Sequence, residues 1–385
     1  MDTQSEILLP EGCVARCNAC HHRLLTNEGS VGKKLAWLQS KLAPWSNTIT
    51  NIVTAGFNQR YGYRGKATLS AKYFGSYWAF GMWRRNEFIA IPCCPVHKTI
   101  INNICSLLSQ FLPPNKNFPL AYLHIAEKQV CLVLKSKNMP DISWFSAELA
   151  TKLEKFGAEA LWIHLNPSAG HRLFEKTPWK LVWGRAFSYD YKGFRYGPSS
   201  FHQLIPVLYQ QSLDMAFNYL TPGNNDLVID LYCGIGHSLD WWLKRGAGAI
   251  GIESSGEAVV HAGINVPGAM VLRGQCHTRV KQLACTINKN YSAKRRLLYA
   301  NPPRKGMGEI VLKWIIEVYK PQKIAYLSCS AGTLSKDLAI LTNAGYIVEQ
   351  ISPFDFFPNT HHIETLCLLN KQNSGITTLP GINTA

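Results

Sequence analysis

Four short, uninterrupted apolar runs recur in the second half of the chain, with helical patterns between them. The runs cover residues 227–231, 249–253, 296–300 and 323–327. Helical periodicity falls at Glu309–Tyr319 and Thr333–Thr342. Apolar runs of this length, alternating with helices, are typical of buried parallel strands joined by crossover helices. The pattern predicts an open α/β sheet, whose ligands bind beyond the carboxyl ends of its strands.

Chemically useful side chains fall where these predicted strands end. Gly234, Glu253, Asn301 and Cys329 each lie at the end of a run or just after it. Because the carboxyl ends of parallel strands meet at one edge of a sheet, these residues are expected to lie near one another. This shared placement predicts a ligand site at that edge.

The first part of the chain has a different organisation. Runs at 120–125, 129–134 and 160–165 read as strands, and Ser146–Phe156 reads as a helix. A helix from Leu204 to Leu220 then ends at Thr221-Pro-Gly. With 385 residues, the chain is long enough for two cores. We predict two α/β domains, residues 1–200 and 201–370, with a flexible tail at 371–385. Residues 23–57 are expected to pack on the second domain.

A glycine-rich segment follows the first predicted strand of the second domain. It reads Asp230-Leu-Tyr-Cys-Gly-Ile-Gly236. Glycines at 234 and 236 allow a tight turn and a close approach of the backbone to a ligand. Glu253 ends the next strand about 20 residues later, where a carboxylate can accept hydrogen bonds from ribose hydroxyls. The third glycine of a dinucleotide site is absent, so a sheet that binds S-adenosylmethionine fits better than one that binds NAD. A plain tight turn is the alternative.

Four segments, taken in order, resemble the S-adenosylmethionine-dependent RNA 5-methyluridine methyltransferases. They are the glycine-rich segment, Asn301-Pro-Pro-Arg304, Leu327-Ser-Cys-Ser330 and the segment from Phe354 to Glu364, which reads FDFFPNTHHIE. The resemblance implies that residues 201–370 form a class I, Rossmann-like methyltransferase domain. It also implies that residues 1–200 form an α/β module that binds RNA.

The same resemblance implies which residues contact the cofactor. It assigns cofactor contacts to Tyr232 and Glu253 beside Gly234, and to Gln203 in Ser200-Phe-His-Gln. Asn301 would hold the cofactor or the uracil. His202, His237 and Gln275 depart from the family pattern, all on the adenine side of the pocket. Arg304 is either a phosphate contact or an ion-pair partner.

A cysteine and a glutamate form the expected catalytic pair. Uracil C5 is a poor nucleophile, and addition of a thiolate at C6 activates it. Methyl transfer follows, and a base must then remove the C5 proton before the thiolate leaves. The resemblance implies that Cys329 is the nucleophile and Glu364 the base. Taken singly, Cys329 could be a small core residue and Glu364 a surface acid.

Cysteines near the start of the chain are spaced like metal ligands. Cys13, Cys17 and Cys20 are close in sequence, and Cys94 precedes Pro95 much later. This layout resembles the iron–sulfur branch of the same family, which implies a [4Fe–4S] cluster on these four cysteines. Zinc is the alternative, with His97 completing a Cys3His site. Cys93 is the adjacent alternative to Cys94. The other cysteines are expected to be packing residues, at Cys105, Cys131, Cys276, Cys285 and Cys367.

An excess of basic residues indicates a polyanionic partner. The formal net charge is +16, with 40 Lys and Arg against 24 Asp and Glu. Aromatic and basic residues interleave at 58–66 and again at 73–85. Tyr63-Arg64-Gly-Lys66 resembles the Phe-Arg-Asn-Lys of the family. A solvated basic face is the alternative.

We therefore expect an enzyme that methylates RNA. The resemblance favours 23S ribosomal RNA, with transfer RNA as the second candidate. A non-catalytic RNA-binding protein that keeps the methyltransferase fold is the alternative from another class. The first residues lack the basic start and apolar stretch of a signal peptide, and no run is long enough to span a membrane. We expect a cytoplasmic monomer without a membrane partner.

Overall fold

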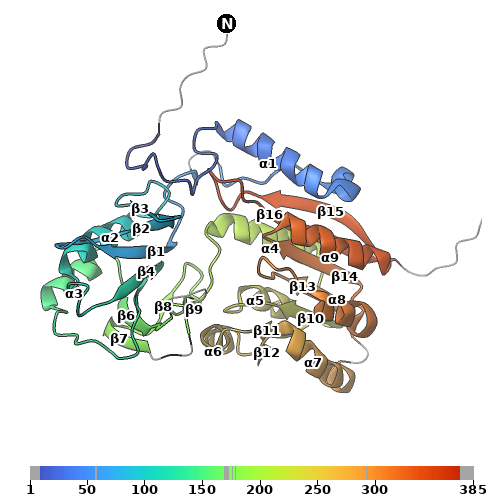
Figure 1. The fold of residues 1–385 in the computed structure, drawn as a ribbon. Coiled ribbons are helices and arrows are strands. Elements are labelled where there is room, and N and C mark those ends of the chain that lie inside the picture. The colour runs from blue at the N-terminus through green and yellow to red at the C-terminus, as the bar shows by residue number, and fades with distance from the viewer. Residues whose placement is uncertain are drawn as a thin grey trace, which may run out of the picture.

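The computed structural model describes residues 9–56, 59–168, 173–175, 177, 179–291 and 294–372, with the backbone alone at 285 and 288–290. The predicted tail beyond 372, Asn58 and the side chain of Cys285 lie outside this description. Two α/β domains lie side by side, and α1 (Asn27–Lys41) lies across one end of the second domain, as Figure 1 shows. The chain is therefore α/β, as the sequence predicts.

The first domain is built on a mostly antiparallel sheet. Its strand order is β3-β2-β1-β4-β5-β6-β7, and only β5 and β6 are parallel. The strands are β1 (Lys66–Tyr73), β2 (Trp78–Arg84), β3 (Glu87–Ala90), β4 (Leu120–Ala126), β5 (Gln129–Leu134), β6 (Ala160–Leu165) and β7 (Trp179–Gly184). Helices α2 (Thr99–Phe111) and α3 (Ala147–Lys155) pack their apolar faces on one side of this sheet. The expected strands at 120–165 and the helix near 146–156 are confirmed.

The second domain contains the predicted parallel sheet. Its order is β12-β11-β10-β13-β14-β16-β15, parallel from β12 to β14 and antiparallel at β16 and β15. The strands are β10 (Asp226–Leu231), β11 (Gly248–Glu253), β12 (Met270–Arg273), β13 (Arg295–Ala300), β14 (Lys323–Ser328), β15 (Tyr346–Phe354) and β16 (Glu364–Lys371). The strand order reverses at β10, which lies between β11 and β13. Ligands in such sheets bind where the order reverses.

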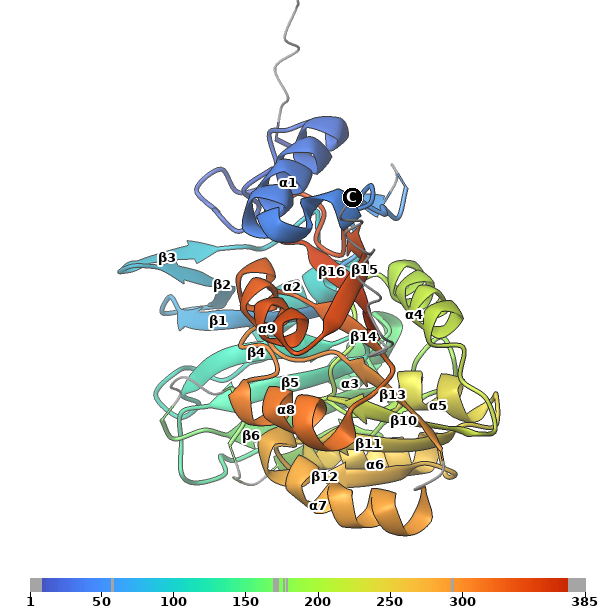
Figure 2. The same ribbon diagram turned by 90° about the vertical axis from the view of Figure 1, so that its right-hand side faces the viewer.

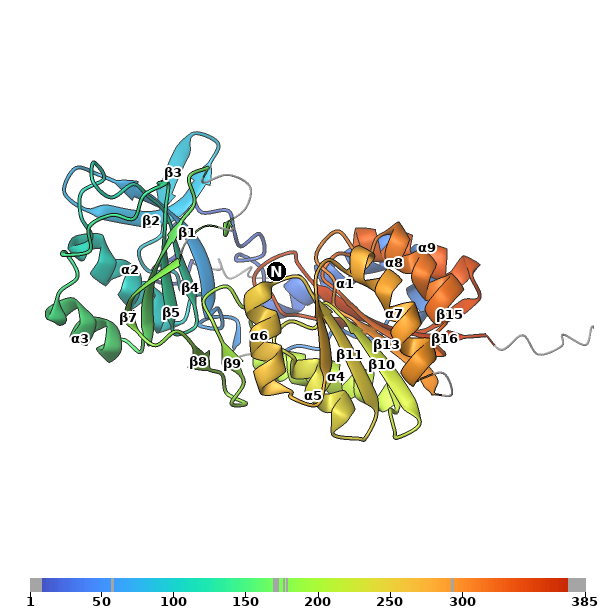
Figure 3. The ribbon, with the colours of Figure 1, turned by 90° about the horizontal axis from the view of Figure 1, so that it is seen from below.

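Helices cover both faces of the second sheet (Figure 3). They are α4 (Pro206–Leu220), α5 (His237–Leu243), α6 (Gly256–Asn265), α7 (Cys276–Asn290), α8 (Glu309–Trp314) with a π-helical turn at Ile315–Tyr319, and α9 (Ala331–Asn343). Consecutive strand residues point to opposite cores, so Ile229 packs with α7, α8 and α9, whereas Val228 packs with α4 and α5. This burial on both faces is the reason that the strands read as continuous apolar runs.

The segment between the cysteines and the first sheet lies against the second domain. A 3-10 helix at Ala43–Thr48 follows α1, and bridges join Ile49 to Ile351 and Val53 to Phe354 of β15. Leu38 and Leu42 are fully buried in the core of the second domain. Figure 2 shows α1 above the ends of β15 and β16. The early part of the chain thus reaches the strand pair that carries Glu364.

Among the described residues, no helix has the length and apolarity required to cross a membrane.

Candidate active site

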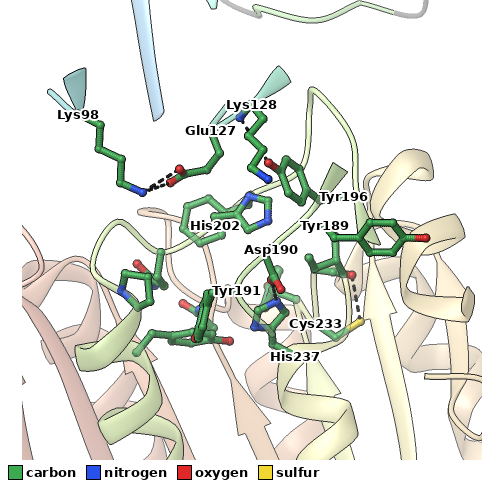
Figure 4. Close-up of a pocket in the computed structure, with 18 residues that line it drawn as sticks. Lys98, Glu127, Lys128, Tyr189, Asp190, Tyr191, Tyr196, His202, Cys233 and His237 are labelled. Atoms are coloured by element: carbon green, nitrogen blue, oxygen red, sulfur yellow. Dashed lines mark hydrogen bonds and ion pairs between the residues drawn. The ribbon is translucent and has the colours of Figure 1, made fainter. Parts of the chain in front are cut away.

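A cavity of about 370 Å³ lies at the carboxyl ends of β10 and β13, between the two domains. Its walls have three sources, shown in Figure 4. The first domain contributes Lys98, Glu127 and Lys128, and the hairpin of β8 (Ser188–Tyr189) and β9 (Arg195–Tyr196) contributes tyrosines. The loops after β10 and β13 complete the cavity. Its size is within the range of small-molecule sites.

The loop after β10 turns sharply at the mouth of the cavity. Tyr232, Gly234 and Gly236 have φ of +65°, +56° and +98°. A Cβ at Gly236 would lie 2.9 Å from a methyl group of Val266, so this position has no room for a side chain. The backbone N–H of Gly234 donates to Glu253 Oε2 at 3.1 Å, and Ser255 N donates to Oε1 at 2.7 Å. These bonds fix the carboxylate of Glu253 beside the glycine turn.

Four of the five residues expected to contact a cofactor line this cavity: Gln203, Tyr232, Gly234 and Asn301. The fifth, Glu253, is beside the cavity and is held there through Gly234. Asn301 directly follows β13, and its N–H donates to the carbonyl of Leu231 at 3.2 Å. The structure thus brings the end of β13 to the end of β10.

Sequence reasoning missed the hairpin that closes one wall. Asp190 accepts from the N–H groups of Lys192 and Phe194 at 2.8 and 2.9 Å and pairs with His237 Nε2 at 2.6 Å. Burial alone would raise the pKa of Asp190. The hydrogen bonds and the charge of His237 have the larger combined effect, so the pKa of Asp190 lies below its ordinary value. The Asp190-x2-Gly193 spacing is a turn signal that could have revealed the hairpin. His237, which departs from the family pattern, therefore has the carboxylate of Asp190 as its partner.

The other two residues that depart from the family pattern, His202 and Gln275, lie in different surroundings. His202 lines the cavity with its ring 4.5 Å from that of Tyr196, and burial lowers its pKa to about 3. A neutral imidazole therefore replaces the usual aromatic ring. Gln275 precedes α7 as its N-cap residue and makes no side-chain capping bond. It is not a lining residue of the cavity.

Cys329 and Glu364 lie at the adjoining ends of two paired strands. β14 and β16 are antiparallel, and their last aligned pair is Ser328 with Thr365. Cys329 follows Ser328, and Glu364 precedes Thr365, so the register places them side by side. The side chain of Glu364 is 3% exposed, and Gln203 Nε2 donates to its Oε2 at 3.0 Å. Through Gln203, the predicted catalytic pair thus contacts the cavity at the ends of β10 and β13, which we call the cofactor-type cavity.

The surroundings of the pair change both pKa values. Burial raises the pKa of Glu364 to about 7, against a smaller lowering by the Gln203 hydrogen bond. Burial and then the charge of Glu364 raise the pKa of Cys329 above its ordinary value, and Arg304 offsets only a part of that rise. A carboxyl group with a pKa near neutrality suits general base catalysis. Arg304 is near enough to favour the thiolate that the nucleophile requires.

An ion pair and several hydrogen bonds from the early part of the chain hold the loop between β15 and Glu364 in place. Lys34 is buried and pairs with Asp355 Oδ1 at 2.6 Å. Lys34 also donates to the carbonyl of Phe357 at 3.1 Å, and Tyr63 Oη donates to that of Pro358 at 3.0 Å. His22 N donates to the carbonyl of Asn359 at 2.9 Å. His361 and His362 follow in the same loop.

A second cavity of about 210 Å³ gathers the early cysteines. Its lining includes the four predicted ligands, Cys13, Cys17, Cys20 and Cys94, together with His97. Cys93 is exposed and does not line it. Burial and repulsion from Cys94, Cys17 and Cys13 raise the pKa of Cys20 to about 11, so these sulfurs lie within electrostatic range of one another. No compact group of three or more His, Cys, Asp or Glu side chains able to hold one metal ion occurs in the described part of the chain.

One of the expected RNA contacts at 63–66 needs correction, at Tyr63. Tyr63 is 8% exposed and is tied to Pro358 through its hydroxyl. Lys66 donates to the carbonyl of Ser200 at 2.8 Å, and burial lowers its pKa to about 8. The aromatic part of the pattern at Tyr63 thus reflects a contact with the loop before Glu364, which the sequence does not distinguish from an RNA-binding face.

Comparison with known proteins agrees with this geometry. Residues 276–372 match the tRNA (uracil-5-)-methyltransferase family. An uncharacterized RNA methyltransferase of Listeria monocytogenes is 32% identical over 250 residues, which cover 63% of this chain and 53% of that protein. One from Listeria innocua is 26% identical over 94% of this chain and 83% of its own length. The chain therefore spans about half the length of the first of these relatives.

A solved structure shares the fold of almost the whole chain. The Pyrococcus abyssi tRNA (uracil-54, C5)-methyltransferase, in complex with S-adenosyl-L-homocysteine, has a TM-score of 0.67 and 20% sequence identity, and the alignment covers 91% of this chain and 85% of that one. The architecture is thus that of a Rossmann-like methyltransferase with an added α/β domain. The segment that matches the tRNA (uracil-5-)-methyltransferase family, residues 276–372, contains both Cys329 and Glu364.

Proposed function

We propose that the chain transfers a methyl group from S-adenosylmethionine to C5 of a specific uridine in RNA, most favourably 23S ribosomal RNA. One observation carries the proposal: the strand register places Cys329 beside Glu364, and Gln203 joins Glu364 to the cavity at the glycine turn. A thiol, a carboxylate with a pKa near 7 and a nucleotide-sized cavity meet at one edge of the sheet.

The chemistry divides between the two side chains. The Cys329 thiolate forms a bond to C6 of the uracil, and the electron pair of the C5–C6 double bond moves onto the C4 carbonyl as an enolate. S-adenosylmethionine supplies the methyl group that C5 then receives. Glu364 takes the C5 proton, the double bond re-forms, and the Cys329–C6 bond breaks. Arg304 supports the thiolate at the start and at the end of this sequence.

The cavity offers suitable partners for the cofactor. Glu253 presents carboxylate oxygens beside the glycine turn, where ribose hydroxyls can donate to them. Tyr232 offers a half-buried ring, and Asn301 offers an amide at the end of β13. The turn at Gly234 brings backbone close to the ligand. These residues, with Gln203, are the proposed cofactor contacts.

The cysteine cavity gathers the side chains that could hold a metal centre. Cys13, Cys17, Cys20 and Cys94 line one hollow, and four thiolates are the ligand set of a [4Fe–4S] cluster. His97 lines the same hollow, so a Cys3His set for zinc is also present. We propose that Cys13, Cys17, Cys20 and Cys94 hold a [4Fe–4S] cluster, with a Cys3His zinc site through His97 as the alternative.

Mass mapping of 5-methyluridine tests the function. Purified protein, S-adenosylmethionine and either 23S ribosomal RNA or total transfer RNA from a strain that lacks the gene would be incubated and digested for nucleoside analysis. New 5-methyluridine in the ribosomal RNA supports the proposal. If 5-methyluridine appeared in transfer RNA alone, transfer RNA would be the substrate instead of 23S ribosomal RNA. Cofactor binding without methylation of either RNA would favour a non-catalytic RNA-binding protein.

A further inference from the structure

An exposed cluster of aromatic rings lies at the free end of the first sheet. Phe74, Tyr77 and Trp83 are 46%, 47% and 48% exposed. Phe74 stacks on Tyr77 with ring centroids 5.6 Å apart, and Phe88 lies 5.2 Å from Trp83. We call these four rings, together with Lys72, the aromatic patch. At the left of Figure 2 the strands that carry it extend outward from the rest of the molecule.

Strand register places the patch on one face of the sheet. Lys72 pairs with Ala79 of β2, and Trp83 pairs with Phe88 of β3. The next residues on these strands point the other way, since Trp78 and Phe80 are buried against α2. The patch therefore occupies the face opposite the helices. Exposed rings next to an edge strand favour aggregation unless they serve a function.

Positive charge accompanies the rings. The ammonium of Lys72 lies 5.0, 5.4 and 5.9 Å from the ring centroids of Phe74, Trp83 and Phe88. Arg85 is exposed in the turn between β2 and β3. The nearby acid Glu87 is already paired with Arg16 at 2.5 Å. Exposed rings beside uncompensated cations match a nucleic acid strand, because its bases stack and its phosphates attract cations.

One strand connects the patch with the candidate active site. Residues that alternate along β1 share a face, so Lys72, Ser70, Thr68 and Lys66 follow Phe74 in one row. At about 3.3 Å per residue, this row is about 26 Å long. Its far end borders a hollow of about 370 Å³ between β1 and residues 201–204. There Lys66 Nζ lies 5.8 Å from the ring of Phe201, which is 59% exposed.

The hollow leads on to the catalytic pair. Gln203 lines both this hollow and the cofactor-type cavity, and it donates to Glu364. A strand lying along β1 would thus pass from the aromatic patch to the site where a uridine must meet Cys329. The target base has to leave its stack to react. The patch gives the neighbouring bases rings on which to stack.

We propose that the aromatic patch binds single-stranded RNA next to the target uridine and that the outward row of β1 carries that strand to the active site. The proposal rests on the proposed function for the identity of the site at the end of the row. The patch itself binds RNA through stacking on Phe74, Tyr77 and Trp83 and through phosphate contacts with Lys72 and Arg85. Stacking predicts tolerance of the base sequence at this surface.

Binding to a fluorescein-labelled twelve-nucleotide oligouridylate tests the proposal by anisotropy. The Kd for Phe74→Ala and for Trp83→Ala should each rise about tenfold, and that of the double variant should rise further. RNA should also quench a part of the tryptophan emission that Trp83→Ala lacks. Trp37→Ala removes a ring that is 40% exposed on α1, outside the patch, and should leave the Kd unchanged.

Other outcomes would overturn the proposal. An unchanged Kd for the double variant, with a native circular dichroism spectrum, would exclude the patch from RNA binding. A wild-type dimer that the double variant abolishes, with RNA affinity unaffected, would make the patch a contact between copies of this chain. Because the assay measures binding, it separates the two proposals: normal RNA binding without methylation contradicts the proposed function alone.

Discussion

The side-chain amide of Gln203 donates a hydrogen bond to Glu364 Oε2 at 3.0 Å. Gln203 also lines the cofactor-type cavity, so a single residue connects that cavity with the proposed base. The bond favours the ionised carboxylate and acts against burial, which raises the pKa of Glu364 to about 7. Gln203 can therefore set the pH at which Glu364 begins to act as a base.

Replacement of Gln203 should change the pH dependence of methyl transfer. Glu364 must be ionised to accept the C5 proton, so the wild-type rate should rise with pH through about 7. In Gln203→Leu the carboxylate loses a donor and its pKa rises. The midpoint of the rise should move to higher pH by about one unit, since a hydrogen bond to a charged group contributes about 1.5 kcal/mol. Single-turnover rates at saturating S-adenosylmethionine between pH 5.5 and 9 would measure this.

A matched glutamine on the surface provides the control. Gln282 is exposed on α7 and accepts from Arg279 Nη1 at 2.7 Å. Gln282→Leu should keep the wild-type profile. If Gln203→Leu lowers the rate equally at every pH, then Gln203 holds the cofactor or the base without tuning its ionisation.

Replacement of Cys329 should abolish methyl transfer. Cys329→Ala removes the sulfur that adds to C6 in the proposed reaction. Methylation should fall at least about 10⁴-fold, in line with the loss of a covalent nucleophile. S-adenosylmethionine binding, measured by isothermal titration calorimetry, should stay within about twofold. Methylation at the wild-type rate would identify a different nucleophile.

Two adjacent cysteines should differ in their effect on metal content. Cys94 lines the cysteine cavity, whereas its neighbour Cys93 is exposed and outside it. Protein purified without oxygen should contain about four iron and four sulfide per chain. Cys94→Ser should lose most of that iron and the associated visible absorbance, and Cys93→Ser should keep both. Stoichiometric zinc without iron in the wild-type protein would instead support the Cys3His site.

The buried pair of Lys34 and Asp355 should contribute strongly to stability. Both side chains are almost fully buried, at 0% and 5% exposure, with 2.6 Å between Nζ and Oδ1. Lys34→Met leaves the carboxylate buried without its cation, which costs about 3–5 kcal/mol in the free energy of unfolding. Urea denaturation would measure the loss. Lys33→Met, at the exposed neighbouring position, should change stability by less than about 0.5 kcal/mol.

A double variant tests the origin of that effect. Lys34→Met combined with Asp355→Leu removes both charges and should recover much of the stability lost by Lys34→Met. A double variant as unstable as Lys34→Met would show that the loss comes from packing. The single variant should also slow methylation, because Asp355 begins the loop that leads to Glu364.

The parallel strands of the second sheet could be predicted because their signal lies within each short segment of sequence. Residues such as Val228 and Ile229 are buried on opposite faces, and burial on both faces produces apolar runs that are visible in the sequence. A strand end is equally local, and this is why Gly234 and Asn301 were placed correctly beside the cavity. Such features require no knowledge of the partner strand.

The remaining contacts of the site join residues that are far apart in the sequence. β16 inserts between β14 and β15, and only that order brings Glu364 next to Cys329. Tyr63 is of a residue type that suits RNA, yet its contact with Pro358 buries it. The pairing of Asp190 with His237 likewise joins a hairpin to a helix across 47 residues of sequence. Composition and spacing carry no signal for such contacts.

Replacement of Glu364 by glutamine should trap a covalent complex of protein and RNA. Cys329 can still add to C6 in Glu364→Gln, and the methyl group can still be transferred, because neither step requires the carboxylate. The amide is nearly isosteric, so the strand pairing at Thr365 and the contact with Gln203 should persist. Release requires loss of the C5 proton, and an amide cannot accept it at neutral pH. The methylated adduct should therefore accumulate.

A denaturing gel with labelled RNA would show the adduct as a slowly migrating band. The band should require S-adenosylmethionine and should disappear in the Cys329→Ala/Glu364→Gln double variant, because the bond is to the sulfur of Cys329. Mass spectrometry of the digested complex should find a methylated uridine attached to the peptide that contains Cys329. Release of free methylated RNA by Glu364→Gln at the wild-type rate, with no band, would show that another group removes the proton. The raised pKa of Glu364 would then reflect its burial alone.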